Sequence, residues 1–444
     1  MQGINIEINR RSGYVWKQSK GLLTTAGKQG QDKSEIGKMK YVLIVGDGMA
    51  DYPIPELGNL TPLQKANTPN LNAVAANGRN GLIRTVPEDL NPGSDVAILS
   101  VLGYDPKRFY TGRGPFEAAA RGIRLGQNDV AFRCNFVTEK AGVLDDYSAG
   151  HITSREAALL IGTLQASLKT NELEFFSGLD YRHFLILRNS PFSNLVECTP
   201  PHDAIGAYIS NILPKTKSEE AEKTTSLLKE KILESKMVLE SHPINIARQK
   251  AGKKPGNMIW PWGGGRKPSL PSFKKKYGLV AAVISAVDLV KGIGIYAGMK
   301  IISVPGATGL YDTNYEGKAD AALKALEEND MVCVHVEAPD EAGHEKDANL
   351  KVKAIEDFDK KVVGRILSGL KEPYAIAVLP DHATPIRIGT HTRDPVPFAI
   401  RSPFLDPDDV RKFDEFSAKK GAFGLVENEY LMSLLVSAGK GIDN

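Results

Sequence analysis

Carboxylates, imidazoles and one hydroxyl occur in short motifs near both ends of the folded sequence. The residues are Asp47, Ser94, Asp340, His344, Asp381, His382 and His391. Oxygen and imidazole ligands together suit Mn²⁺, Zn²⁺, Co²⁺ or Mg²⁺ better than a soft metal. Two such cations could bind phosphate oxygens and lower the pKa of a coordinated nucleophile. The set therefore predicts two divalent metal ions, with Mn²⁺ as the first expectation, and phosphoryl-group chemistry with Ser94 as nucleophile.

The spacing of these residues supports one shared site. Asp340 and His344 are four apart, so one helical turn would direct both side chains to one point. A serine at a helix N-terminus gains from the helix dipole and from free N–H groups, which favour an alkoxide and a phosphate. Such a serine would form a phosphoserine intermediate.

Each residue also has a structural interpretation. Asp47-Gly is a common turn, Ser94 could be a helix N-cap, and Asp340 with His344 could be a surface pair. His335 alternates with apolar residues in a strand, so we interpret it as a core histidine. The order of the motifs favours a metal site, because every member follows a strand or begins a helix.

The predicted elements explain how the motifs come together. Apolar runs predict strands over residues 40–46, 331–339 and 374–380, and helical spacing is found in 350–370. Thr68-Pro69 predicts a helix with Thr68 as its N-cap, and a second helix should begin at Gly93-Ser94. Strands that alternate with helices indicate an α/β fold with a mostly parallel sheet, whose site lies at the strands' C-terminal ends.

The domain organisation follows from the positions of the motifs. Because both ends supply the site, residues 39–114 and 281–444 should form one metal-binding domain. Residues 115–280 contain polar turns and a charged amphipathic segment around 217–240, and predict a second α/β domain inserted as a substrate lid. We interpret residues 1–38 as a disordered extension.

Composition restricts the compartment and the partners. Residues 1–38 carry seven Lys or Arg and three Asp or Glu, so the remainder of this +3 chain is close to neutral and gives no indication of nucleic-acid binding. No apolar run reaches the length of a membrane helix. Three cysteines without CxxC spacing favour a reducing cytoplasm. We expect a small phosphorylated substrate, no membrane partner and no P-loop nucleotide site, while the oligomeric state stays open.

Several long motifs resemble a known family. They are GDGMADYPIPELGNLTPLQKANTPN, NPGSDVAILSVLGYDP, TGRGPFEAAARGI, GATGLYDTNYEGKA, HVEAPDEAGH, LPDHATP and GTHTRDPVPF. Over residues 39–444 the sequence is similar to the alkaline phosphatase superfamily, and specifically to cofactor-independent phosphoglycerate mutases of the archaeal type. The resemblance implies two metal sites. Asp47, Ser94, Asp381 and His382 would hold one ion, and Asp340, His344 and His391 the other.

The same resemblance implies a reaction. Ser94 would take the phosphoryl group of 3-phosphoglycerate and return it to the other hydroxyl, which gives 2-phosphoglycerate without 2,3-bisphosphoglycerate. The inserted domain would exclude water. The candidates for binding the substrate's carboxylate and phosphate are His151, Arg182, Arg266 and Lys318.

One segment departs from the family pattern. Mutases of this type carry a Leu-Leu-Arg-Gly-Ala-Gly stretch where this chain has Ile259-Trp-Pro-Trp-Gly-Gly-Gly-Arg266. This version resembles a sister branch proposed to be homoserine kinases. Phosphoryl transfer to homoserine or a similar small alcohol is therefore the alternative to the mutase. A phosphatase or sulfatase of the superfamily and a non-enzymatic binding role are further hypotheses.

Overall fold

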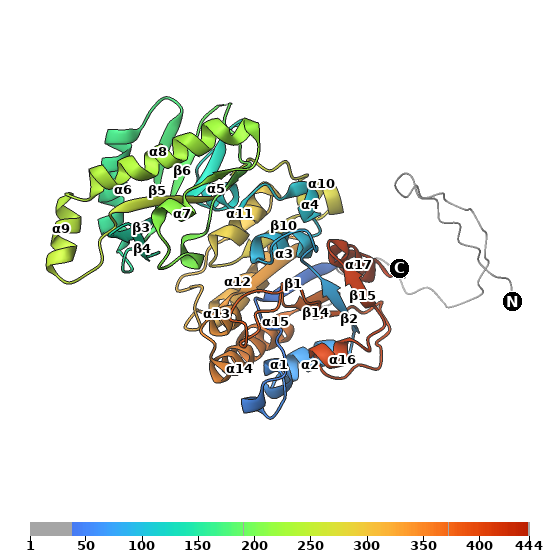
Figure 1. Ribbon diagram of the computed structural model, residues 1–444. Coiled ribbons are helices and arrows are strands. Elements are labelled where there is room, and N and C mark those ends of the chain that lie inside the picture. The colour runs from blue at the N-terminus through green and yellow to red at the C-terminus, as the bar shows by residue number, and fades with distance from the viewer. Residues whose placement is uncertain (1–37, 190, 372, 443–444) are drawn as a thin grey trace, which may run out of the picture. The chain divides into compact units, whose positions relative to one another are not determined.

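The computed structural model describes residues 38–189, 191–371 and 373–442 (Figure 1). Except for Lys38, the predicted N-terminal extension therefore lies outside the described residues. No helix in the described part of the chain is long and apolar enough to cross a membrane.

An eight-stranded sheet forms the larger layer of the described chain. Its strand order is β11-β10-β12-β1-β13-β14-β2-β15. β1 pairs in parallel with β12 on one side and with β13 on the other, and only β14 runs against its neighbours. The bounds are β1 Lys40–Gly46, β2 Arg79–Arg84, β10 Ala281–Ile284, β11 Lys300–Ile302, β12 Met331–Val336, β13 Tyr374–Leu379, β14 Val396–Arg401 and β15 Gly424–Glu427. The predicted mostly parallel α/β sheet is confirmed.

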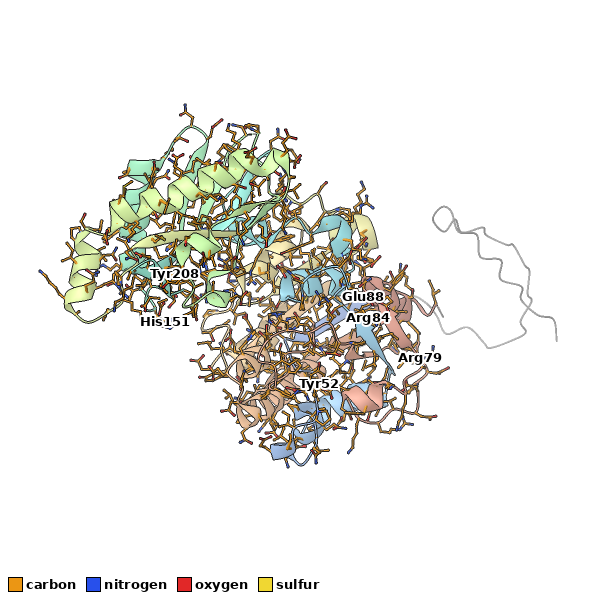
Figure 2. The ribbon with its side chains drawn as sticks, viewed as in Figure 1. Tyr52, Arg79, Arg84, Glu88, His151 and Tyr208 are labelled. Carbon is orange, nitrogen blue, oxygen red and sulfur yellow. The ribbon has the colours of Figure 1, made fainter. Side chains whose placement is uncertain are left out.

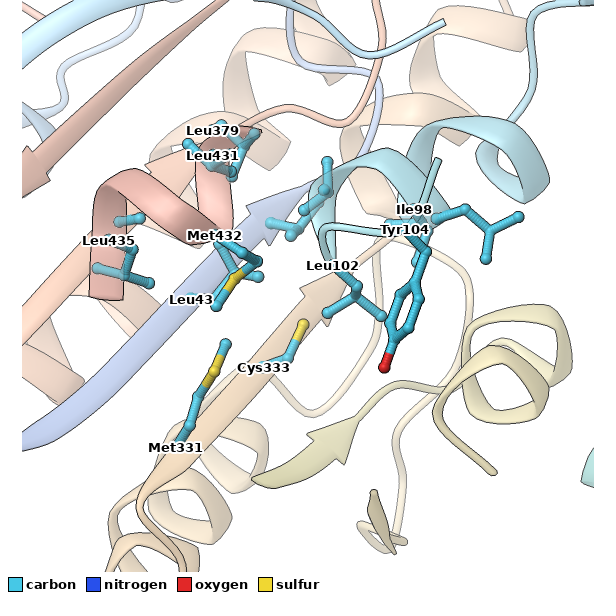
Figure 3. Close-up of a cluster of buried hydrophobic side chains, with 14 of the residues drawn as sticks. Leu43, Ile98, Leu102, Tyr104, Met331, Cys333, Leu379, Leu431, Met432 and Leu435 are labelled. Carbon is cyan, nitrogen blue, oxygen red and sulfur yellow. The ribbon is translucent and has the colours of Figure 1, made fainter. Parts of the chain in front are cut away.

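The sheet is buried on both faces, which explains why its central strands are continuous apolar runs. Alternate side chains of β1 enter different clusters: Leu43 and Val45 join one, and Val42 and Ile44 the other. Figure 3 shows part of the first cluster, to which β1 contributes Leu43, β12 contributes Cys333 and α17 contributes Met432. The helices of this face are α3 Ser94–Val101, α11 Asp288–Tyr296 and α17 Tyr430–Lys440.

Helices from distant parts of the sequence cover the second face. They contribute Leu71 and Val74, Ala319 and Ala322, and Phe358 to its cluster. The helices are α2 Pro69–Ala76, α12 Tyr315–Glu328, α14 Ala348–Asp357, the π-helical turn η4 Phe358–Val363 and α15 Gly364–Gly369. The predicted helix over 350–370 is thus present, with a π-helical turn within it.

A separate five-stranded sheet lies in the middle of the sequence, in the green part of Figure 1. Its strands are β3 Val130–Lys140, β4 Val143–Asp146, β5 Leu173–Leu179, β6 Arg182–Leu187 and β9 Met258–Arg266. It packs with α6 Ser154–Leu168 and α8 Glu222–Leu239. These strands fall within the range predicted for the inserted domain, and the domain boundaries themselves stay a prediction.

The hydrogen bonds at the start of α2 come from a residue that the sequence did not indicate. Thr68 is the N-cap residue, but its side chain makes no capping hydrogen bond. The carboxylate of Asp359 instead accepts hydrogen bonds from the backbone N–H groups of Asn70 and Leu71, at 3.3 and 2.6 Å. The Asn70 side chain donates to the same carboxylate at 2.8 Å. The predicted N-cap position of Thr68 is confirmed, but a residue distant in sequence satisfies these donors in place of the threonine side chain.

Asp359→Ala should lower the free energy of unfolding by about 2 kcal/mol, because it leaves buried N–H groups without an acceptor. Urea unfolding would measure the loss. The matched control is Asp320→Ala, which removes an exposed carboxylate paired with Arg365 and should have little effect. Equal stability of the two variants would contradict the assigned role of Asp359.

Candidate active site

The predicted catalytic and metal-binding residues meet where three adjacent strands of the larger sheet end. Asp47 follows β1, and Asp381 and His382 follow β13. Helix α13, Ala338–His344, begins after β12 and carries Asp340 and His344. Because β12, β1 and β13 are parallel neighbours, their C-terminal ends lie at one edge of the sheet.

The first group consists of Asp47, Asp381 and His382, which are all fully or almost fully buried. His382 Nε2 lies 3.4 Å from Asp47 Oδ1 and 3.5 Å from Asp381 Oδ2. The same nitrogen is 3.1 Å from Ser94 Oγ. Ser94 is the first residue of α3, with Gly93 as the N-cap, so the hydroxyl stands at a helix N-terminus beside His382.

The second group consists of Asp340, His344 and His391. His344 Nε2 lies 3.1 Å from Asp340 Oδ2 and 3.0 Å from His391 Nε2, and His391 Nε2 is 3.6 Å from Asp340 Oδ1. One helical turn between Asp340 and His344 allows this convergence, as the spacing predicts. The ring of His382 also lies 4.2 Å from that of His391, centroid to centroid, so His382 borders both groups.

The first group has buried carboxylate oxygens that fit a bound cation. Asp47 Oδ1 and Asp381 Oδ2 are buried and have no hydrogen-bond partner among the described residues. Burial and the nearby carboxylate of Asp381 hold the pKa of Asp47 well above its usual range. A dication between these oxygens would remove both penalties, because it supplies the positive charge and the ligand bonds that they lack.

The second group is electrostatically different. Although burial alone would raise it, the hydrogen bonds from His344 and His391 hold the pKa of Asp340 well below its usual range. Burial opposes the charged form of His344 as well, but Asp340 raises its pKa to about 9. A proton between His344 and Asp340 therefore occupies a position that a cation could take.

Residues beside the groups orient the ligands, and sequence reasoning missed most of them. Thr384 Oγ1 donates a hydrogen bond to Asp340 Oδ1 and lies 3.2 Å from His382 Nδ1, so it contacts a member of each group. His335 is buried as predicted, but it also contacts the site, because its Nε2 is 3.1 Å from Asp47 Oδ2. The alternation of its strand could have placed His335 beside the end of β1.

The four predicted substrate-binding residues lie in different surroundings. Lys318 is fully buried in α12, where its Nζ donates to the carbonyl of His335 at 3.3 Å, and burial lowers its pKa to about 8. Arg266 donates to the carbonyl oxygens of Asn128 and Phe192. His151 is exposed, on the unit with the five-stranded sheet (Figure 2). The substrate roles of these residues stay predictions.

Arg182 has surroundings that favour contact with an anion. It is exposed at the start of β6, with its guanidinium 4.5 Å from the centroid of the Tyr181 ring. Burial raises the pKa of Glu341, one residue after Asp340, and the charges of His344 and Arg182 partly offset that increase. Arg182 is thus close enough to affect a carboxyl group next to the second group.

A cluster of arginines around Glu117 was also missed in the sequence. Arg113 Nε lies 2.5 Å from Glu117 Oε1, and Arg133 Nε lies 3.2 Å from Glu117 Oε2. The guanidinium of Arg133 stacks 4.5 Å from the Trp262 ring. Arg113 lies within the motif TGRGPFEAAARGI, and that context was the available signal. One carboxylate between two guanidinium groups leaves a surplus of positive charge.

Comparisons with known proteins agree with this arrangement. A family model described as 2,3-bisphosphoglycerate-independent phosphoglycerate mutase matches residues 75–245. A protein of that name from Methanosarcina mazei is 52% identical over 404 residues, covering 90% of this chain and 100% of the relative. A probable mutase of the same kind from Geobacter sulfurreducens is 49% identical with the same coverage.

Solved structures show the same fold. The PH0037 protein from Pyrococcus horikoshii matches with a TM-score of 0.78 and 32% identity, over 92% of this chain and 99% of that one. The cofactor-independent phosphoglycerate mutase from Thermoplasma acidophilum matches with a TM-score of 0.61 and 29% identity, over 90% of this chain and 100% of that one.

Fold and site define an α/β protein with carboxylates, imidazoles and a serine at one sheet edge. The chain belongs to the 2,3-bisphosphoglycerate-independent phosphoglycerate mutase family.

Gly48→Ala should disrupt the site. A Cβ atom at Gly48 would stand 2.5 Å from Asp340 Oδ1 and 2.7 Å from Thr384 Oγ1, so Asp340 would have to move. We expect Mn²⁺ affinity to fall by about tenfold or more, measured by calorimetric titration.

The matched control is Gly58→Ala. Both glycines have positive φ, +62° and +75°, so both variants carry the same backbone cost of about 1–2 kcal/mol. A Cβ atom at Gly58 meets no described atom within 4 Å, and Mn²⁺ affinity should stay at the level of the unmodified protein. Equal Mn²⁺ affinity in both variants would contradict the role given to Asp340.

Proposed function

We propose that this protein interconverts 3-phosphoglycerate and 2-phosphoglycerate through a phosphoserine on Ser94, without 2,3-bisphosphoglycerate. The observation that carries the proposal is the position of Ser94 Oγ, 3.1 Å from His382 Nε2 and at the start of α3. The names of relatives about 50% identical over 90% of the chain support the choice of substrate.

The two groups are the proposed ligands of two divalent ions, for which Mn²⁺ is our first choice. Asp47, Asp381 and His382 with Ser94 would hold one ion, and Asp340, His344 and His391 the other. The ions would lower the pKa of the serine hydroxyl and neutralise the phosphoryl oxygens. The N-terminus of α3 adds its dipole at the same point, which favours both the ionised hydroxyl and an incoming phosphate.

The arginines of the five-stranded-sheet unit and the segment before it suit a substrate with two anionic ends. A guanidinium group binds a carboxylate or a phosphate with two parallel hydrogen bonds. Arg182 acts on Glu341 beside the second group, and it also contributes to the low pKa of the Glu117 carboxyl group, which burial opposes and Arg133 and Arg113 favour. We propose that Arg182, with Arg113 and Arg133, binds the carboxylate of the glycerate.

The segment Trp260–Trp262, which differs from the family pattern, is compatible with this proposal. Trp262 packs against the guanidinium of Arg133, and its Nε1 donates to Asn135 Oδ1 at 3.1 Å. The segment therefore supports a cation that comes from β3. A carboxylate is present on both glycerate and homoserine, so this contact fits either acceptor, and the names of the relatives favour the mutase.

We further propose that the five-stranded-sheet unit excludes water from the phosphoserine, which would otherwise make the enzyme a phosphatase. The three cysteines are free, as expected in the reducing cytoplasm that we propose as its location.

Ser94→Ala should reduce mutase turnover by at least about a thousandfold, because it removes the atom that receives the phosphoryl group. The assay uses Mn²⁺-loaded protein and 3-phosphoglycerate, couples the product to enolase, and contains no 2,3-bisphosphoglycerate. Calorimetry should show that the variant still binds Mn²⁺ through its carboxylates and imidazoles.

Two results of that assay would reject the proposal. Full activity in Ser94→Ala would exclude the phosphoserine, and no turnover in unmodified protein that holds two metal ions would exclude the mutase. In the second case, homoserine-dependent consumption of a phosphate donor is the next assay.

Arg182→Met should raise KM for 3-phosphoglycerate by about tenfold, the cost of one charged hydrogen bond, with little change in stability. Arg248→Met is the matched control. Its guanidinium donates to the carbonyl oxygen of Ala149 and pairs with Glu156, so we expect lower stability and an unchanged KM. Steady-state kinetics and urea unfolding separate the two effects, and an unchanged KM in Arg182→Met would remove Arg182 from the substrate site.

A further inference from the structure

A lysine without a place in the proposed chemistry lies directly behind the site. Lys351 is in helix α14 and is fully buried. Its Nζ lies 2.9 Å from Asp51 Oδ2 and donates to the carbonyl oxygens of Thr384 at 2.9 Å and Ala50 at 3.3 Å. All three ammonium protons therefore have acceptors.

The three acceptors belong to the two segments that carry the first group. Ala50 and Asp51 follow Asp47 after β1, and Thr384 follows His382 after β13. Asp51 strengthens the connection, because its carboxylate also accepts the backbone N–H of Ile386 at 3.1 Å. Lys351 thus joins the segment after β1 to the segment after β13.

The connection reaches the second group through Thr384. The carbonyl of Thr384 accepts the lysine, and its hydroxyl contacts Asp340 and His382. Packing here leaves little freedom, because a Cβ atom at Gly343 of α13 would stand 2.7 Å from the same Thr384 carbonyl oxygen. Any shift of Thr384 would consequently change the spacing between the two groups.

Stability alone does not explain a fully buried ion pair. Removing two charges from water costs free energy that their attraction often fails to recover, and apolar replacements can be as stable. A role in fixing one arrangement of the chain is the better explanation at this position, since each contact of the lysine ends on a ligand-bearing segment.

We infer that Lys351 is a positioning residue that holds the segments after β1 and β13 at the spacing required for two cations. This inference rests on the proposed two-metal function. Loss of Lys351 should therefore lower the affinity for metal, and any loss of turnover would follow from the weaker metal binding.

The test uses the double variant Lys351→Met with Asp51→Asn. Lys351→Met alone would leave the Asp51 carboxylate buried and unpaired, and could fail to fold for that reason. The double variant removes both charges and keeps an amide oxygen to accept the N–H of Ile386. It loses the bonds from the ammonium group to Ala50 and Thr384.

The matched control is Lys231→Met. Lys231 is a largely buried lysine of α8, in the five-stranded-sheet unit, and pairs with Glu230 and Glu234 at 2.8 and 2.7 Å. The substitution removes a largely buried ammonium group away from the site. Circular dichroism and urea unfolding establish the folded state of each variant, and calorimetric titration with Mn²⁺, without substrate, measures affinity and stoichiometry.

We expect the double variant to fold and to bind Mn²⁺ about tenfold or more weakly, while Lys231→Met keeps the original affinity. Unchanged Mn²⁺ affinity in the folded double variant would overturn the inference. A double variant that does not fold would overturn it as well, because Lys351 would then support the whole domain rather than the ligand segments.

The test is independent of the proposed reaction. Weak Mn²⁺ binding in the double variant, together with no mutase activity in the unmodified protein, would support the positioning role and reject the mutase. Normal Mn²⁺ binding in the double variant, together with mutase activity in the unmodified protein, would reject the positioning role and support the mutase.

Discussion

The burial of several carboxylates at one edge of the sheet is the constraint on which the rest of the site depends. Asp47, Asp340 and Asp381 are almost completely buried, and two of their oxygen atoms have no hydrogen bond from the described residues. Buried charge of one sign is costly unless a counter-charge is present. Imidazoles and a helix N-terminus supply part of it, and two cations would supply the rest.

The sheet makes this concentration of charge possible. Apolar side chains on both faces fix the order and register of β12, β1 and β13, so that the residues after each strand must meet. β12 and β13 lie about 290 and 330 residues after β1 in the chain, yet polar residues follow within two positions of the end of each strand. The same burial keeps solvent from the polar groups and strengthens their interactions.

Much of this was predictable from local sequence. The apolar strands, the start of α3 at Ser94 and the four-residue spacing of Asp340 and His344 are local signals, and the structure has each of them. Contacts between distant residues could not be predicted. Asp359 provides the hydrogen bonds expected from the Thr68 side chain, and Lys351 reaches Thr384 only after the sheet has formed. Arg133 likewise reaches Glu117 only through packing, whereas Arg113 and Glu117 are four residues apart on one helix and form a local pair.

The most direct test of the account is the position of bound metal in a crystal grown with Mn²⁺. Anomalous diffraction at the manganese absorption edge locates the ions without reference to activity. We predict two peaks, one among Asp47, Asp381, His382 and Ser94, and one among Asp340, His344 and His391. A fully soaked crystal with no peak at these side chains, or with its peaks elsewhere, would contradict the account.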